Sequence, residues 1–206
     1  MISAVMISCD QRDSVRRETL DNLSTTDWAW PVRVVLDSEG LSPEEMNTFD
    51  PQQKQLHASR HALVIALTVQ MPWIVFMEDD LLFNRHIAHN IKLWEPIRNG
   101  TLNFGSLYCP GDQDYGTLET GVCWREVNPE VCYGSQCYIM SREAAQWAVE
   151  HWNSIEGLQD IKLTRHARGK AVLYHVPCLV QHREVVSVWG GQHHFAKSFD
   201  AAWMCE

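Results

Sequence analysis

The alternation of apolar runs and helical patterns over residues 2–77 is the feature that most restricts the fold of this chain. Two short apolar runs, at 2–9 and 73–77, and the segment VRVVL at 32–36 have the length of strands, and helical patterns separate them. The expected strands cover 2–9, 32–36 and 73–77, and the expected helices cover 13–23 and 51–70. This order predicts a parallel sheet with right-handed crossovers. We therefore expect an α/β protein with a single Rossmann-like domain, whose mostly parallel central sheet is flanked by helices.

Local signals place the helix starts. Asp50-Pro51-Gln52-Gln53 combines a capping aspartate, a proline in the first turn and a glutamine three residues after the cap. Asp13 or Ser14 is expected to cap the first helix, and 41–50 is expected to be a loop. The second half is less regular. Its expected elements are a helix over 86–97, a strand near 102–109, a long loop over 110–132, a strand over 137–140, a helix over 142–152 capped by Ser141, a short helix starting at Asp160, and extended segments over 171–174 and 179–181.

Length and composition narrow the class of protein. The chain has 206 residues, the size of one domain. Its net charge of −9 argues against binding duplex nucleic acid mainly through non-specific phosphate contacts, although a local basic site stays open. No run of roughly 18 apolar residues is present, so no membrane span is expected. The N-terminus lacks the basic region of a secretion signal, and we expect a cytoplasmic protein of a bacterium or a virus-infected cell.

The seven cysteines are expected to be reduced. Their number is odd, the chain is large for a disulfide scaffold, and no CxxC pair occurs. Cys123 and Cys132 are the one pair considered for a bridge.

Three consecutive acids follow the clearest buried strand, WIVFM at 73–77. Glu78, Asp79 and Asp80 repel one another, and a divalent cation compensates such repulsion well. Hard oxygen ligands favour magnesium or manganese over zinc. In parallel sheets ligands bind beyond the carboxyl ends of the strands, where this triplet is expected. The alternative is a solvated turn in which an aspartate caps the next helix.

His182 is the second candidate metal ligand. It follows an apolar segment at 177–181, which should lie in the core. Imidazole is a good ligand for manganese, and His182 would close a site that begins with Asp80. The alternative is a core histidine with ordinary hydrogen-bond partners, which is the more common fate of a single histidine.

Four segments, in this order, resemble GT-A glycosyltransferases, which use nucleotide sugars and carry a DxD-type metal motif. They are ISAVMISC at 2–9, the helix over 51–70 leading into WIVFMEDD, GSQCYIMSREAAQWA at 134–148 and HVPCLVQH at 175–182. The last two are similar to segments of lipopolysaccharide-type family 25 enzymes and of N-acetylglucosaminyltransferase IV-like enzymes. The resemblance covers most of 1–187. It implies a GT-A-like fold in which 1–100 binds the nucleotide sugar, 101–185 binds the acceptor and carries catalysis, and the tail 186–206 folds over the site.

The resemblance also implies roles for single residues. Asp80 and His182 would bind Mn²⁺ or Mg²⁺, and Asp79 or Glu78 would contact ribose or sugar hydroxyls. The glutamate in the first motif position departs from the plain DxD form. Arg60 would approach the diphosphate, and a uridine diphosphate sugar is the donor that such folds use most commonly. The base and ribose are expected at the turns after the first two strands, at Cys9, Asp10, Gln11, Arg12 and Asp37.

An inverting sugar transfer needs a general base that deprotonates the acceptor hydroxyl, which contributes ~10²–10⁴-fold. Asp160 is the candidate, because it lies where similar inverting enzymes place their catalytic acid. The alternative is a helix N-cap without chemistry. Glu156 and Glu119 are the reserve candidates, and without a well-placed carboxylate a retaining mechanism becomes the expectation.

The sequence thus predicts a metal-dependent glycosyltransferase that moves a sugar from a nucleotide-diphosphate sugar to an acceptor hydroxyl. The acceptor stays open among a glycan, a lipid-linked sugar, a protein and a modified nucleobase. A metal-dependent nucleotidyltransferase or phosphohydrolase is the second interpretation, which the lack of a Gly-rich P-loop weakens. The third is a non-catalytic module that binds a sugar or a nucleotide.

Overall fold

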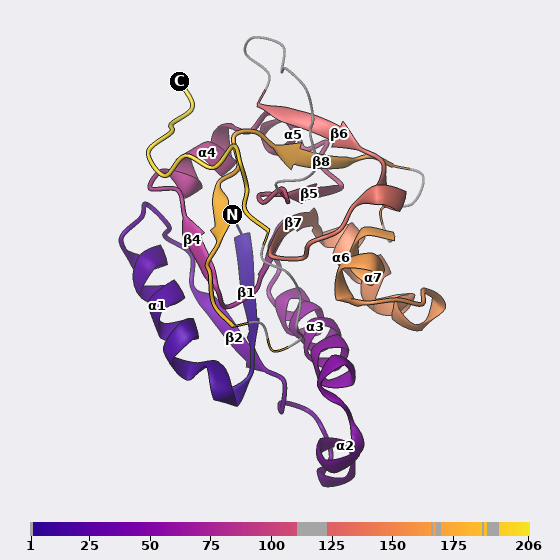
Figure 1. Ribbon diagram of the computed structural model, residues 1–206. Helices are drawn as coiled ribbons and strands as arrows, with labels where there is room; N and C mark the ends of the chain where they lie inside the picture. Colours follow the sequence, from indigo (N-terminus) through magenta and orange to yellow (C-terminus); the bar gives the residue numbers. More distant parts are fainter. Residues whose placement is uncertain (1, 111–122, 166, 168–169, 187, 189–193) are drawn as a thin grey trace.

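A seven-stranded sheet forms the centre of the computed structural model, which describes residues 2–110, 123–165, 167, 170–186, 188 and 194–206 (Figure 1). Its strands are β1 Ile2–Ser8, β2 Val32–Leu36, β3 Trp73–Met77, β5 Phe104–Ser106, β6 Trp124–Val127, β7 Cys137–Ser141 and β8 Val172–His175. They lie in the order β2-β1-β3-β7-β5-β8-β6. All run in one direction except β6 and β7, so the sheet is mostly parallel, as expected.

Helices flank this sheet (Figure 1). The two helices α3 and α6 pack against each other and against β3, and α1 packs on β4 of a small second sheet. The helices are α1 Asp13–Ser24, α2 Pro43–Thr48, α3 Pro51–Thr68, α4 Ile87–Leu93, α5 Glu95–Arg98, α6 Arg142–Glu150 and α7 Gln159–Arg165, and the small sheet pairs β4 Leu81–Phe83 with β9 Val180–His182. No helix among the described residues is long and apolar enough to cross a bilayer.

The strand–helix pattern predicted for the first half is confirmed. The central strand β1 is buried along its whole length and pairs in parallel with both β2 and β3. Helix α3 begins where its capping signal predicts, because the Asp50 carboxylate accepts a hydrogen bond from the Gln53 N–H, and the Gln53 side chain accepts one from the Asp50 N–H. The carboxyl ends of β1, β2 and β3 therefore meet at one edge of the sheet.

Two helix predictions in the first half are wrong in detail. Residues 41–50 contain α2, which starts with the same kind of capping box as α3, formed here by Ser42 and Glu45. The N-cap of α1 is Arg12, without a side-chain cap, rather than Asp13 or Ser14. Asp13 instead occupies the first turn and pairs with Arg17 at 2.8 Å.

The single helix expected over 86–97 is two helices, α4 and α5. The break falls at Trp94, whose ψ of 118° is not helical. Pro96 lies two residues later, and proline favours the first turn of a new helix because it has no N–H to donate. The loop expected over 110–132 contains β6, and 111–122 lie outside the described residues.

Strand β7 lies between β3 and β5 and is antiparallel to both. Its register pairs Met77 at the end of β3 with Cys137 at the start of β7. Consequently the N–H of Glu78 donates to the carbonyl oxygen of Gln136 at 2.9 Å. This pairing brings the segment before β7 to the carboxyl end of β3.

The small sheet places His182 beside the acidic triplet. In this antiparallel pair, Leu81 of β4 lies opposite His182 of β9. The N–H of Arg183 donates to the main-chain oxygen of Asp80 at 2.8 Å. Backbone pairing alone therefore brings together two residues that are far apart in the sequence.

Candidate active site

A cavity of ≈ 630 Å³ opens at the carboxyl ends of β1, β2 and β3, where an α/β fold binds its ligands. The turns after these strands form one wall, and α3, the segment before β7, the start of α7 and the end of β9 form the others. Ten residues that the sequence singled out line it: Cys9, Asp10, Gln11, Arg12, Asp37, Glu78, Asp79, Asp80, Asp160 and His182.

Arg60 is the exception among the predicted site residues. It is exposed on α3 and is not among the residues that line the cavity. The face of α3 toward the cavity carries Lys54, Gln55 and Ala58, and the helical period turns Arg60 away from them. Lys54 is therefore the basic side chain that α3 brings to the cavity, and its charge acts on the nearby Asp37.

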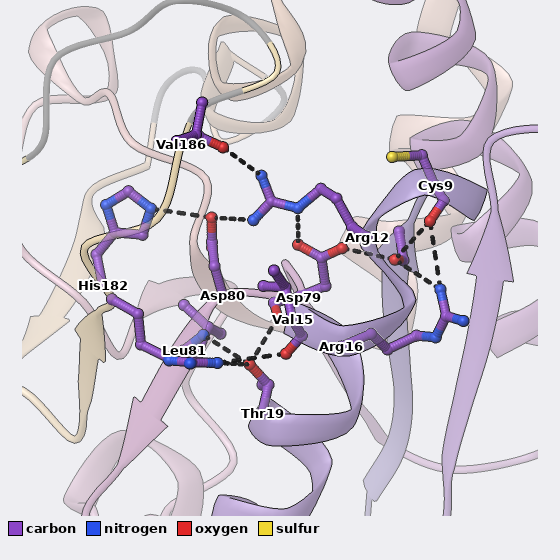
Figure 2. A network of polar contacts seen from close by, with 12 residues as sticks. Cys9, Arg12, Val15, Arg16, Thr19, Asp79, Asp80, Leu81, His182 and Val186 are labelled. Carbon is purple, nitrogen blue, oxygen red and sulfur yellow. Dashed lines mark hydrogen bonds and ion pairs between the residues drawn. The ribbon is translucent and has the colours of Figure 1, made fainter.

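Asp80 lies between two positively charged or chargeable groups (Figure 2). Its Oδ2 is 2.6 Å from Nη2 of Arg12 and 3.2 Å from Nε2 of His182. Burial opposes ionisation of Asp80, but the hydrogen bond and charge of His182, together with Arg12, outweigh it and lower the pKa of the carboxyl. Burial also acts to lower the pKa of His182, yet Asp80 raises it on balance. The two residues thus favour an ion pair.

Both oxygens of the Asp79 carboxylate are already engaged (Figure 2). Ser8 donates its hydroxyl to Oδ2 at 2.5 Å, and Nε of Arg12 is 2.9 Å from Oδ1. The main-chain oxygen of Asp79 accepts from the Thr19 hydroxyl at 2.6 Å. Asp79 therefore ties β1 and α1 to the end of β3.

Glu78 is held by neutral donors. The Ser135 hydroxyl and the Gln159 amide both donate to Oε1, at 2.6 and 3.1 Å. Burial, with repulsion from Asp80 added, raises the pKa of Glu78 to about 7, although the bond from Ser135 acts against this. Glu78 is among the residues that line the cavity, and no described residue donates to its Oε2.

The Gln159 amide is itself oriented from α3. The Ser59 hydroxyl lies 2.7 Å from Oε1 of Gln159 and 2.7 Å from the main-chain oxygen of Gln55, so its one proton is shared between these two acceptors. With Oε1 facing Ser59, the amide nitrogen points toward Glu78 and Ser135. Ser59 and Gln159 are 0% and 2% exposed. Sequence reasoning did not find this chain of hydrogen bonds, and no local pattern signals it, because its members lie on separate elements.

Asp160 faces the same cavity from the start of α7. Its Oδ2 accepts from the N–H of Gly134 at 3.1 Å, and its Oδ1 from the N–H of Ile161 at 2.8 Å. Gly134 has a φ of +84°, and a Cβ there would lie 2.9 Å from the side-chain oxygen of Gln136. Of the reserve candidates, Glu156 does not line the cavity and Glu119 lies outside the described residues.

The expected tail over the site is described in part. Val188 and His194 line the cavity, whereas 187 and 189–193 lie outside the described residues. The main-chain N–H of Ala196 donates to Oε1 of Gln181 at 2.9 Å, and Nε2 of Gln181 donates to the main-chain oxygen of Ala196 at 3.1 Å. The tail is thus fastened to the strand that carries His182.

Asp80 and His182 offer a carboxylate and an imidazole nitrogen to a divalent cation. Oδ1 of Asp80 is buried and accepts no hydrogen bond from any residue that the structure describes. The described residues hold no group of three His, Cys, Asp or Glu side chains placed to bind a metal ion. Magnesium is commonly held by one or two carboxylates plus substrate phosphates. Asp80 and His182 would therefore supply only part of the ligands of such a cation.

Three solved structures resemble this chain over most of its length. A glycosyltransferase involved in glycosylation of the major capsid of PBCV-1 has a TM-score of 0.53 at 12% identity, covering 90% of this chain and 94% of that one. The galactosyltransferase LgtC, with donor and acceptor sugar analogs, has 0.51 at 11%, covering 90% and 87%. TarS 1–349 of S. aureus, in complex with UDP-GlcNAc, has 0.51 at 13%, covering 84% of this chain and only 58% of that one.

No model of a known protein family matches the sequence, and no curated protein sequence matches it. At 11–13% identity the likeness concerns the fold. This likeness shows an α/β fold of the GT-A-like kind seen in these glycosyltransferases. The similarity to family 25 and to N-acetylglucosaminyltransferase IV-like enzymes stays a prediction.

Proposed function

We propose that this chain is a glycosyltransferase that moves a sugar from a nucleoside-diphosphate sugar to an acceptor hydroxyl. One observation carries the proposal: Asp80, His182 and a second carboxylate, Asp160, line one cavity at the carboxyl ends of β1–β3, and a buried oxygen of Asp80 has no hydrogen-bond partner among the described residues. The GT-A-like fold supports it, since the similar structures include a galactosyltransferase with donor and acceptor analogs.

The donor is proposed to bind across the turns after β1 and β2. Asp10 and Asp37 supply acceptors for ribose hydroxyls, and burial raises the pKa of Asp37, with Asp10 adding to this. Arg12 and Lys54 supply the positive charge for the diphosphate, where an arginine forms bidentate bonds. A uridine carrier is supported by TarS, which was solved with UDP and with UDP-GlcNAc.

Asp80 and His182 are proposed to hold Mn²⁺ or Mg²⁺ at the diphosphate. Such a cation acts as a Lewis acid that neutralises charge on the leaving phosphate. Glu78 is proposed to accept a hydrogen bond from a donor hydroxyl through Oε2, because both of its bonds from described residues go to Oε1.

Asp160 is proposed as the general base of an inverting transfer. Its two main-chain donors, the N–H groups of Gly134 and Ile161, fix the carboxylate at the cavity wall. There it would take the proton of the acceptor hydroxyl as that oxygen attacks the sugar. The acceptor is proposed to be a glycan, a lipid-linked sugar, a protein or a modified nucleobase.

A thermal-shift screen tests the donor site. Mn²⁺ with UDP is expected to raise the Tm of the protein, since a ligand at about 100 times its Kd adds roughly 2.7 kcal/mol of stability. The Asp80→Asn variant should lose this shift, and Asp21→Asn, which changes an exposed acid on α1, should keep it. An equal shift in both variants would remove Asp80 from the site.

Release of UDP from UDP-GlcNAc and other UDP-sugars tests the reaction. Turnover should fall by about 10²-fold or more in Asp160→Asn while the UDP-dependent Tm shift persists. Binding without turnover of any nucleotide sugar would favour the non-catalytic module. Hydrolysis of nucleoside triphosphates in place of nucleotide sugars would favour the phosphohydrolase.

A further inference from the structure

Apolar side chains line the same cavity as Asp160 and stay open to solvent. Leu158 lines the cavity and is 51% exposed, and Val188 also lines it and is 41% exposed. Tyr133 lines it as a half-buried aromatic ring. Single exposed apolar residues are common on protein surfaces, but these three border one cavity. We refer to Leu158, Tyr133 and Val188 as the apolar rim.

Two residues of the apolar rim are held close to Asp160 by the backbone. The N–H of Gly134 donates to Oδ2 of Asp160 at 3.1 Å, and Tyr133 is the residue before Gly134. Leu158 lies two residues before Asp160, and its main-chain oxygen accepts from the N–H of Lys162 in the first turn of α7 at 2.9 Å. A hydroxyl that Asp160 deprotonates must come within hydrogen-bond reach of its carboxylate. The atoms next to that hydroxyl in the acceptor therefore come close to apolar side chains.

The basic side chains of α7 are engaged elsewhere. Nζ of Lys162 donates to the main-chain oxygen of Trp152 at 2.9 Å. Nε of Arg165 is 3.0 Å from a carboxylate oxygen of Glu130. Neither Lys162 nor Arg165 is among the residues that line the cavity. Helix α7 thus brings Asp160 to the cavity without bringing a cation.

The arginine and lysine that line the cavity come from other elements. Among the described residues they are Arg12, in the turn after β1, and Lys54, on α3. Arg12 is already engaged with Asp79 and Asp80. The start of α7 and the segment before β7, which hold Asp160, therefore offer apolar groups and a carboxylate to an acceptor, and neither lysine nor arginine.

We propose that the acceptor is a neutral glycolipid, whose apolar chain lies on the apolar rim while a hydroxyl of its sugar faces Asp160. This inference rests on the sugar transfer proposed above and names its acceptor. Burial of the chain against the rim removes apolar surface from water on both partners, which favours binding. A phosphate next to the reacting hydroxyl would meet the Asp160 carboxylate without a lysine or arginine from the same elements, so phosphate-linked sugars and nucleic acids are disfavoured.

The transfer to such an acceptor balances without a further reactant. The hydroxyl oxygen of the glycolipid forms a bond to the anomeric carbon of the donor sugar. The bond from that carbon to the diphosphate breaks, and the nucleoside diphosphate leaves with the electron pair. Asp160 takes the proton of the hydroxyl.

A pair of glycosides that differ only in chain length tests the role of the apolar rim. Isothermal titration calorimetry on the full chain, with and without Mn²⁺ and UDP, compares methyl and octyl β-glycosides of glucose, galactose and N-acetylglucosamine. The octyl forms are kept below their critical micelle concentration. For at least one sugar the octyl glycoside should have a Kd about 10-fold lower or more than the methyl glycoside, because its chain buries apolar surface. With UDP bound, octyl phosphate should bind more weakly than that octyl glycoside.

Variants assign the effect to the rim. Leu158→Ser should reduce the ratio of the methyl to the octyl Kd by about 3-fold or more, whereas Leu158→Met, which keeps an apolar side chain of similar size, should preserve it. Leu82→Ser is the matched control: Leu82 is 37% exposed on β4 and does not line the cavity, so the ratio should stay at the wild-type value.

Several results would overturn the proposal. One is octyl glycosides that bind no better than methyl glycosides, and another is a gain that Leu158→Ser leaves unchanged. Tighter binding of octyl phosphate would favour an anionic acceptor. A dimer that Leu158→Ser dissociates in size-exclusion chromatography would assign the rim to a second copy of the chain. The Tm shift with Mn²⁺ and UDP reports the donor site separately. Its absence counts against sugar transfer, whereas its presence together with equal Kd values counts against the glycolipid alone.

Discussion

Replacing Ser59 with alanine tests whether this residue of α3 orients the Gln159 amide that donates to Glu78 and Ser135. The serine hydroxyl lies 2.7 Å from Oε1 of Gln159, and both residues are buried. The variant leaves that amide oxygen without a donor from the described residues, which costs about 1–3 kcal/mol. In a chain of this length each kcal/mol lowers Tm by about 2–4 °C, so a drop of roughly 2–12 °C is expected.

A double-mutant cycle separates this hydrogen bond from a general effect of removing a hydroxyl. Urea denaturation of Ser59→Ala, Gln159→Ala and the double variant gives the free energy by which the two side chains interact. We expect about 1 kcal/mol or more, because the residues are in direct contact. Ser154→Ala is the matched control. The Ser154 hydroxyl bonds to the main-chain oxygen of His151, as the Ser59 hydroxyl does to that of Gln55, but Ser154 is exposed, and the cost should stay within about 0.5 kcal/mol. A Ser59→Ala cost that is the same with and without Gln159 would refute the orientation argument.

Three further predictions address single positions. Glu78 has a pKa raised from 4.5 to about 7 in the folded chain, so its contribution favours folding at low pH and is lost as the pH rises from about 4.5 to 7. In metal-free protein, urea denaturation across this range should show a loss of up to roughly 3 kcal/mol in wild type relative to Glu78→Gln; parallel profiles would contradict it. Gly100→Ala should lower the free energy of unfolding by about 1–2 kcal/mol, because the positive φ of this glycine strains any residue with a Cβ. Gly134→Ala should lower it further, because Gly134 has the same strain and its new Cβ would also meet close neighbours, whereas nothing lies near the one at Gly100. Equal unfolding free energies of the two variants would contradict this. Ser141→Ala should cost about 1 kcal/mol in thermal unfolding, since its side chain caps α6 through the N–H of Ala144; an unchanged Tm would show that the cap contributes nothing.

The first half of the fold was predictable because its signals are local. The apolar runs of β1 and β3, and the capping box at Asp50, depend on neighbours only a few residues away. The same kind of capping signal is present at Ser42, but the sequence analysis predicted a loop there instead of α2. The direction of β7 was not predictable, because a five-residue buried strand has the same composition whether it pairs in parallel or antiparallel.

The candidate site divides in the same way. Strand order predicted the acidic triplet at the carboxyl edge of the sheet, and the resemblance to GT-A enzymes added the turn after β1 and Asp37, which line the same cavity. Arg60 was predicted in the site and Lys54 was not, but the structure has Lys54 at the cavity. Choosing between them requires knowing which face α3 turns toward the cavity, and the sequence does not give this. Ser59 and Gln159 lie on two helices joined by no sequence pattern, and only packing of α3 near α7 brings them together.

Three neighbouring acids can remain at the buried end of β3 because groups from several parts of the chain compensate them. Neutral donors hold Glu78, whose raised pKa also allows it to take up a proton. Ser8 and Arg12 hold Asp79, and Arg12 is shared with Asp80. Arg12 and His182 together neutralise the carboxylates of Asp79 and Asp80. The oxygen least well stabilised is Oδ1 of Asp80, which is buried and has no donor among the described residues. An added positive charge would stabilise the site most at this oxygen, because an unpaired buried polar atom is costly. The electrostatics of the folded chain therefore favour a cation at Asp80, the residue that the resemblance to GT-A enzymes also implies as a metal ligand.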